Sequence, residues 1–217
     1  EPEFFATITG FANAAAALGV PLRAFTTDAD VDVLSLGGTK NGAIGAEAIV
    51  VLRPGASEGL RYLRKLNMQL GSKQRFASAQ LIALFEGELW LESAAHANAM
   101  ATRLRDALAD AAAAGSLAFT QSTDSNAVFA RLPLAAANTL RPRFGFYDWA
   151  GPFADGTVEV RWMCSWDTTE ADVDAFAAAI IAACGEHRPA GRTGSPADAS
   201  GEVPVATTAV GGISQPA

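Results

Sequence analysis

The sequence predicts an α/β protein with one domain over residues 1–86 and a small C-terminal α/β domain over residues 87–185. Two short apolar runs, typical of buried strands, flank a glycine-rich turn at residues 37–45. From residue 116 onward, short strand patterns alternate with helical ones, an order that suits a small α/β domain beside a larger one. Residues 186–217 are rich in Pro, Gly, Ser, Thr and Ala without an apolar period, and we expect a disordered tail there.

Composition narrows the class of protein. Hydrophobic residues make up 50% and charged residues 18% of the 217 residues, so a sizeable core is possible. A net charge of −7 and the absence of a basic stripe argue against nucleic acid as a partner. No apolar run is long enough to cross a bilayer, and the N-terminus shows no signal peptide, so we expect a cytoplasmic protein without a membrane partner. Cys164 and Cys184 lack metal-ligand spacing, which indicates two reduced core thiols.

The elements of the first domain are predicted from the spacing of apolar residues and from the residues that begin or end helices and strands. An alanine-rich helix is predicted over 11–18, where Gly19 ends it, and strands are predicted over 32–36 and 48–52. Ser57 is a candidate cap for a helix whose leucines recur at positions 60, 63, 66 and 70. The helix that follows, over 76–85, is apolar nearly all round and is expected to be buried.

The second domain begins with the longest helical pattern in the chain, over 88–114, which Gly115 ends. Small residues on its apolar stripe permit close contact with another helix. Thr169 with Asp172 three residues later indicates the start of a last helix, which Gly185 closes. Between these two helices the sequence predicts strands over 117–120, 127–132, 144–149 and 158–164 and a helix over 133–140.

Lys40 is the first candidate functional residue, because it stands among small residues in the turn between two apolar runs. If apolar neighbours enclose it, burial lowers the pKa of its amine, which then attacks carbonyl groups and forms a Schiff base with an aldehyde cofactor. The alternative is a solvent-exposed lysine on a surface turn, which the spacing by itself favours. Neither a G-x-x-x-x-G-K-[ST] loop nor a G-x-G-x-x-G loop is present here.

Other polar residues have plainer interpretations. Asp28, Asp30 and Asp32 alternate before a strand, but nothing completes a calcium loop, so we expect a solvated loop and no metal. His96 lies in the long helix and is expected to be packed or half-exposed rather than a ligand. Arg161 lies in a strand with Glu159 two residues before it on the same face, so an outward ion pair is one interpretation.

Several segments resemble one enzyme family. Gly37-Gly38-Thr39-Lys40-Asn41-Gly42 after Asp32-Val33-Leu34-Ser35 is similar to the cofactor-lysine segment of the threonine aldolase (β-eliminating lyase) family. The resemblance continues in Ser72-Lys73-Gln74-Arg75-Phe76 and Ala79-Gln80. It returns in Val160-Arg161-Trp162 and Ser165-Trp166-Asp167-Thr168-Thr169-Glu170. These are pyridoxal-phosphate enzymes of the aspartate aminotransferase fold type, so the resemblance implies a partial cofactor-binding large domain of fold type I before the small domain.

The resemblance also implies roles for individual residues. Lys40 would be the catalytic lysine that binds pyridoxal 5'-phosphate, and Thr39 would assist the phosphate or the ring. Arg161 would bind the carboxylate of an amino acid substrate, because a guanidinium matches a carboxylate bidentately. Lys65 and Arg75 are further basic candidates for substrate or phosphate contact. The implied reaction is retro-aldol cleavage of a β-hydroxy-α-amino acid to glycine and an aldehyde, by a homo-oligomer.

The chain departs from the family pattern in two ways. Thr7-Ile8-Thr9-Gly10 stands where the family has Asp-Gly-Ala-Arg, whose Asp holds the pyridine nitrogen protonated and whose Arg contributes to substrate binding. The N-terminal half, which supplies a ring-stacking histidine and much of the phosphate site, is absent, so we expect a C-terminal fragment. Two alternatives therefore stay open: an inactive remnant that acts as an oligomerising or binding module, and a lyase of the same fold type acting on a different amino acid.

Overall fold

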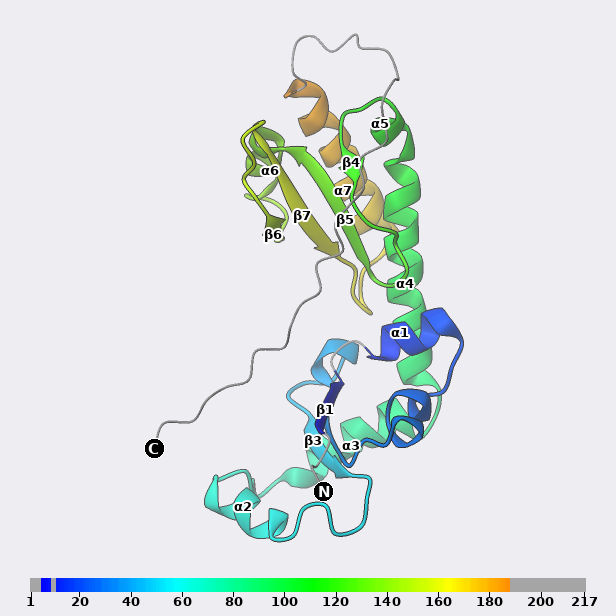
Figure 1. The fold of residues 1–217 in the computed structure, drawn as a ribbon, viewed down its shortest axis with the longest axis vertical. Coiled ribbons are helices and arrows are strands. Elements are labelled where there is room, and N and C mark those ends of the chain that lie inside the picture. Colours follow the sequence, from blue (N-terminus) through cyan, green and yellow to red (C-terminus); the bar gives the residue numbers. More distant parts are fainter. Residues whose placement is uncertain (1–4, 9–10, 188–217) are drawn as a thin grey trace.

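The computed structural model describes residues 5–8 and 11–187, and the predicted tail from 188 onward lies outside the described residues. Two sheets lie at opposite ends of the long helix α4 (Leu89–Ala107), as Figure 1 shows. The mixed α/β architecture agrees with the prediction. The domain boundary near residue 86 stays a prediction, because α4 packs against elements of both halves.

The first sheet carries the lysine turn. Its strand order is β1-β2-β3, with β1 parallel to β2 and β2 antiparallel to β3. The predicted first helix forms with the predicted bounds and ends at Gly19, whose φ of 63° is the left-handed conformation that glycine adopts most easily. The elements are β1 (Phe5–Ile8), α1 (Phe11–Leu18), the 3-10 turns η1 (Leu22–Phe25) and η2 (Thr27–Ala29), β2 (Val33–Gly37), η3 (Thr39–Asn41) and β3 (Glu47–Val51).

Helix α4 connects the two halves because its apolar stripe is made largely of small residues. Ala101 is buried in the core of the second half, while Ala94 and Ala97 are buried at the end of α4 that α1 contacts. At this contact the buried side chain of Asn13 donates hydrogen bonds to the Ala94 carbonyl (3.2 Å) and to Asn98 Oδ1 (3.1 Å), while Asn98 Nδ2 donates to the Asn13 carbonyl (2.9 Å). The predicted single helix to residue 114 instead breaks at Leu108, and α5 (Ala109–Ala113) follows.

The second sheet is antiparallel, with strand order β4-β5-β7-β6. Alternation along β5 and β7 buries every second side chain against helices α4, α6 and α7, including Val128, Val160 and Trp162. The intervening side chains, Phe129 and Arg161 among them, lie on the other face. The elements are β4 (Ala118–Phe119), β5 (Ala127–Pro133), α6 (Leu134–Leu140), β6 (Tyr147–Ala150), β7 (Thr157–Met163) and α7 (Glu170–Glu186).

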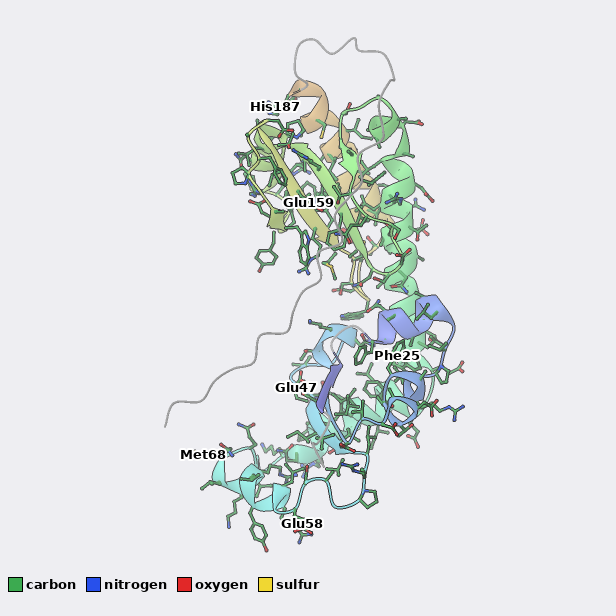
Figure 2. All side chains as sticks on the ribbon, in the orientation of Figure 1. Phe25, Glu47, Glu58, Met68, Glu159 and His187 are labelled. Carbon is green, nitrogen blue, oxygen red and sulfur yellow. The ribbon has the colours of Figure 1, made fainter. Side chains whose placement is uncertain are left out.

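The predicted burial of the helix over 76–85 is wrong for this chain. Helix α3 (Gln74–Phe85) buries Leu84 alone, while Phe76 and Ile82 are 56% and 54% exposed. Helix α2 (Leu60–Leu66) begins after Gly59 rather than at Ser57 and buries no residue. Figure 2 shows the segment around Glu58 and Met68 at the lower end of the molecule, and the Met68 side chain is 90% exposed there.

The predicted start of the last helix is confirmed. Thr169 Oγ1 accepts a hydrogen bond from the Asp172 backbone N–H (3.1 Å), and the Asp172 carboxylate accepts one from the Thr169 backbone N–H (3.0 Å). The Thr169 hydroxyl also donates to the Asp172 carboxylate (2.6 Å), and this bond, followed by the one from the Thr169 backbone N–H, lowers the pKa of Asp172 below its ordinary value. Helix α7 runs past Gly185, which therefore does not end it. Cys164 and Cys184 are free and buried as predicted, and burial raises the pKa of each thiol to about 11.

We expect Thr169→Ala to lower the free energy of unfolding by about 1 kcal/mol, because the first turn of α7 loses its cap. Urea unfolding followed by circular dichroism measures the change. Thr102→Ala is a matched control, since Thr102 bonds only the Asn98 carbonyl within α4 (3.2 Å). Equal losses in the two variants would contradict the role of the cap.

Candidate active site

Lys40 lies in the short turn η3 between β2 and β3. The turn closes because the backbone N–H groups of Asn41 and Ala43 both donate to the Gly38 carbonyl (3.0 Å each). An added Cβ at Gly38 would lie 2.9 Å from the Cβ of Ala43, so a glycine is needed where the turn folds back. Gly42 has a φ of 98°, which only glycine adopts without strain.

The structure agrees with the alternative of a solvent-exposed lysine, and the enclosure by apolar neighbours that the Schiff-base hypothesis requires is not found among the described residues. Lys40 is exposed, because the residues around it in the turn are small and form no wall. Its amine makes no hydrogen bond or ion pair with any residue that the structure describes. The amine is therefore accessible to an incoming carbonyl group.

Three contacts from distant elements hold the lysine turn. Trp166 packs on Gly42, where an added Cβ would lie 3.1 Å from the indole ring. Asn41 Nδ2 donates to the Trp90 carbonyl (3.4 Å), and the Ile44 backbone N–H donates to Gln80 Oε1 (2.6 Å). The turn is thus exposed to solvent but fixed in position.

His96 contributes to this arrangement indirectly. Its Nε2 lies 2.7 Å from the Thr168 carbonyl, in the same loop as Trp166. The sequence predicted a packed or half-exposed histidine, and the side chain is exposed with this one contact. Sequence reasoning did not identify Trp166 or His96 as supports of the turn, although Trp166 lies in one of the segments that resemble the family.

Thr39 is exposed beside Lys40, and its hydroxyl donates to Glu47 Oε1 (3.2 Å). A carboxylate next to this hydroxyl disfavours an anion at the same position. The cofactor-binding role of Thr39 stays a prediction.

Arg161 lies in the middle of β7, directly opposite Phe129 on β5 and Tyr147 on β6. The side chain is half-buried, and its Nε is buried without a hydrogen-bond partner. The guanidinium lies over the Trp149 ring, with 4.9 Å between Cζ and the ring centroid. A charged donor that is buried without a partner is energetically costly in a folded chain.

The alternative ion pair between Arg161 and Glu159 does not form. The Glu159 carboxylate instead accepts a hydrogen bond from the Thr120 hydroxyl (2.6 Å). The chain segment that contains Arg161 also continues into the loop that places Trp166 on Gly42. One segment therefore holds the guanidinium and supports the lysine turn.

The other basic candidates lie on helices α2 and α3, between Lys40 and Arg161 in the sequence. Lys65 is exposed in the last turn of α2, and Arg75 is exposed in the first turn of α3, where its guanidinium lies 4.8 Å from the Phe76 ring centroid. Their roles in substrate or phosphate contact stay predictions.

Two of the three alternating aspartates form ion pairs with arginines. Asp32 is buried and pairs with Arg53 (2.8 Å), and Asp28 pairs with Arg23 (3.7 Å). Among the described residues, no group of three or more His, Cys, Asp or Glu side chains is placed to hold a metal ion. Within the same residues, every helix is too short or too polar to span a bilayer.

Comparison with known proteins identifies the family. Residues 8–133 match the model of the beta-eliminating lyase family. The chain is 40% identical over 173 residues to a low specificity L-threonine aldolase of a Pseudomonas species, covering 79% of this chain and 48% of that protein. It is 39% identical over 159 residues to the enzyme of the same name from Pseudomonas aeruginosa, covering 73% and 44%.

Two solved structures are similar in fold. Leishmania major threonine aldolase matches with a TM-score of 0.71 and 25% identity, over 83% of this chain and 51% of that one. Sphingomonas wittichii serine palmitoyltransferase matches with a TM-score of 0.50 and 17% identity, over 72% of this chain and 40% of that one. The predicted fold class is thus confirmed.

The chain belongs to the beta-eliminating lyase family, as its sequence resemblance predicts. It spans about half the length of the curated relatives it matches.

We expect Gly42→Ala to lower the free energy of unfolding by roughly 1 kcal/mol more than Gly45→Ala does. Both glycines have positive φ, at 98° and 67°, but only an alanine at position 42 would collide with Trp166. Urea unfolding measures the difference, and displacement of Trp166 should shift the tryptophan emission of Gly42→Ala alone. Identical behaviour of the two variants would show that the Trp166 contact does not hold the turn.

Proposed function

We propose that this chain carries the lysine and the carboxylate-binding arginine of a pyridoxal-phosphate-dependent lyase. The proposed reaction is retro-aldol cleavage of a threonine-like β-hydroxy-α-amino acid to glycine and an aldehyde, in the cytoplasm. The observation that carries the proposal is the buried, unpartnered Nε of Arg161, on the segment whose next loop supports the turn of Lys40. The relatives named threonine aldolase supply the substrate class.

The described residues offer one group that suits the cofactor and one that suits its amino acid substrate. The free, exposed amine of Lys40 suits an aldehyde, and the guanidinium of Arg161 suits the carboxylate of an amino acid bound beside it. When bound, pyridoxal phosphate supplies an electron sink for the carbanion left when the Cα–Cβ bond breaks. Thr39 is less suited to bind the phosphate of the cofactor, since its hydroxyl already donates a hydrogen bond to Glu47.

The protein side of the mechanism is mainly positioning. Two parallel N–H donors of Arg161 would fix the substrate carboxylate, and hence the orientation of the scissile bond. The contacts of Trp166, Asn41 and Gln80 restrict where the Lys40 amine can move. To attack a carbonyl carbon, the amine must be uncharged, so a water-excluding wall is needed that the described chain does not provide.

A second copy of this chain is the partner that we propose for α2 and α3, as in a homo-oligomer. Large apolar side chains are exposed on these two helices and in the connection between them, and such surfaces on a soluble protein indicate an interface. If the site proves inactive, this surface supports the alternative of an oligomerising remnant. The exposed side chains are Tyr62 (72%), Leu63 (52%), Leu66 (77%), Met68 (90%), Leu70 (51%), Phe76 (56%) and Ile82 (54%).

We expect borohydride reduction of the chain mixed with pyridoxal phosphate to attach the cofactor to Lys40, and a visible absorbance band to precede it. Lys40→Ala should lose both signals, because it lacks the reacting amine. Lys73→Ala, which removes another exposed lysine, should keep both. Peptide mass spectrometry locates the label, and labelling spread evenly over the surface lysines would refute the proposal.

We expect Leu66→Glu to shift the chain toward the monomer in sedimentation equilibrium, because burying a charge at an apolar interface is energetically unfavourable. Leu18→Glu is the control, since Leu18 is similarly exposed (67%) but lies on α1, away from α2 and α3. A wild-type chain that is monomeric at all concentrations would exclude the homo-oligomer.

A further inference from the structure

An irregularity in β6 lies next to the proposed carboxylate site. Asp148 pairs with Val160 and Ala150 pairs with Glu159, so Trp149 between them has no partner residue on β7. An extra residue of this kind is a β-bulge, which bends the strand locally and changes the direction of a side chain. Bulges occur frequently beside functional sites for this reason.

The bulge places the indole of Trp149 against Arg161. The guanidinium carbon lies 4.9 Å from the centroid of the indole, within the range of a cation–π contact. Phe129, directly opposite Arg161 on β5, packs edge-on against Trp149, with 5.2 Å between ring centroids and an angle of 74°. The aromatic ring covers one face of the guanidinium, whose N–H donors have no hydrogen-bond partner among the residues that the structure describes.

No acidic side chain competes for Arg161 among the described residues. The carboxylates of β6, β7 and the turn between them are each bound elsewhere: Glu159 by Thr120, Asp155 by Arg131 and Asp148 by Arg141. The aromatic contact is thus what orients Arg161, and the charge of its guanidinium remains available to a ligand.

We propose that Trp149 is a positioning residue, which holds the guanidinium of Arg161 with its N–H edge toward a ligand carboxylate. An arginine side chain has much rotational freedom, and stacking on the indole limits that freedom before the ligand binds. The identity of the ligand, an α-amino acid, rests on the proposed function. The role of Trp149 itself rests on the bulge, the ring contact and the unpartnered Nε.

The test is a titration of the ¹⁵N-labelled chain without cofactor, followed through the Nε–H signal of Arg161, which Arg161→Lys assigns. L-Threonine should move this signal, and L-threoninol, which lacks the carboxylate, should not. Trp149→Leu should raise the Kd for L-threonine about fivefold, because the cation–π contact is lost. Trp149→Phe should recover most of the affinity, since a ring remains over the guanidinium.

Tyr147→Leu is the matched control. Tyr147 lies on the same strand, opposite Arg161, but is 78% exposed, and no contact between its ring and the guanidinium is found in the described chain. Equal weakening by Tyr147→Leu and Trp149→Leu would overturn the proposal, and so would an Arg161 signal that L-threonine does not move. Cofactor labelling of Lys40 is independent of these results, so the failure of the proposed function and the failure of this inference are distinguishable.

Discussion

The packing of Trp166 on Gly42 is the contact on which the candidate site depends. The indole comes from the loop between β7 and α7, and the glycine follows the lysine turn, so this contact joins the two halves of the molecule where chemistry is proposed. A Cβ at position 42 would lie 3.1 Å from the indole, a contact tight enough to shift the ring, and the positive φ there favours glycine in any case. Backbone freedom and close packing are therefore needed at the same residue.

Strand β7 serves both the core and the site because successive side chains point to opposite faces. Trp162 is 2% exposed and packs among the aromatic rings beneath the helices, while its neighbour Arg161 lies on the open face. The rigid core side of the strand thus fixes the direction in which the arginine points. The Nε of Arg161 is buried without a partner, which destabilises the folded chain. The stable sheet around it or a bound anion offsets this energetic cost.

The apolar surfaces of helices α2 and α3 are not covered by other described residues of this chain. Their sequence has the apolar content of buried helices, yet their large side chains are exposed. The same incompleteness applies to Lys40, which lies in the open although the proposed chemistry requires an enclosed amine. Both observations agree with a chain that spans about half the length of its relatives.

Local signals in the sequence determined much of the fold. The bounds of α1, the capping box at Thr169, the small-residue stripe of α4 and the strands on either side of the lysine turn were all predictable, because each depends on residues close together in the chain. Position 40 as the reactive amine and position 161 as the carboxylate binder came from the resemblance to a family, and both remain proposals. Tertiary structure alone decided the exposure of Lys40, the freedom of Arg161 from Glu159, and the contacts of Trp166 and Trp149. These features depend on which distant segments meet in space. A local sequence pattern contains no information about such long-range contacts.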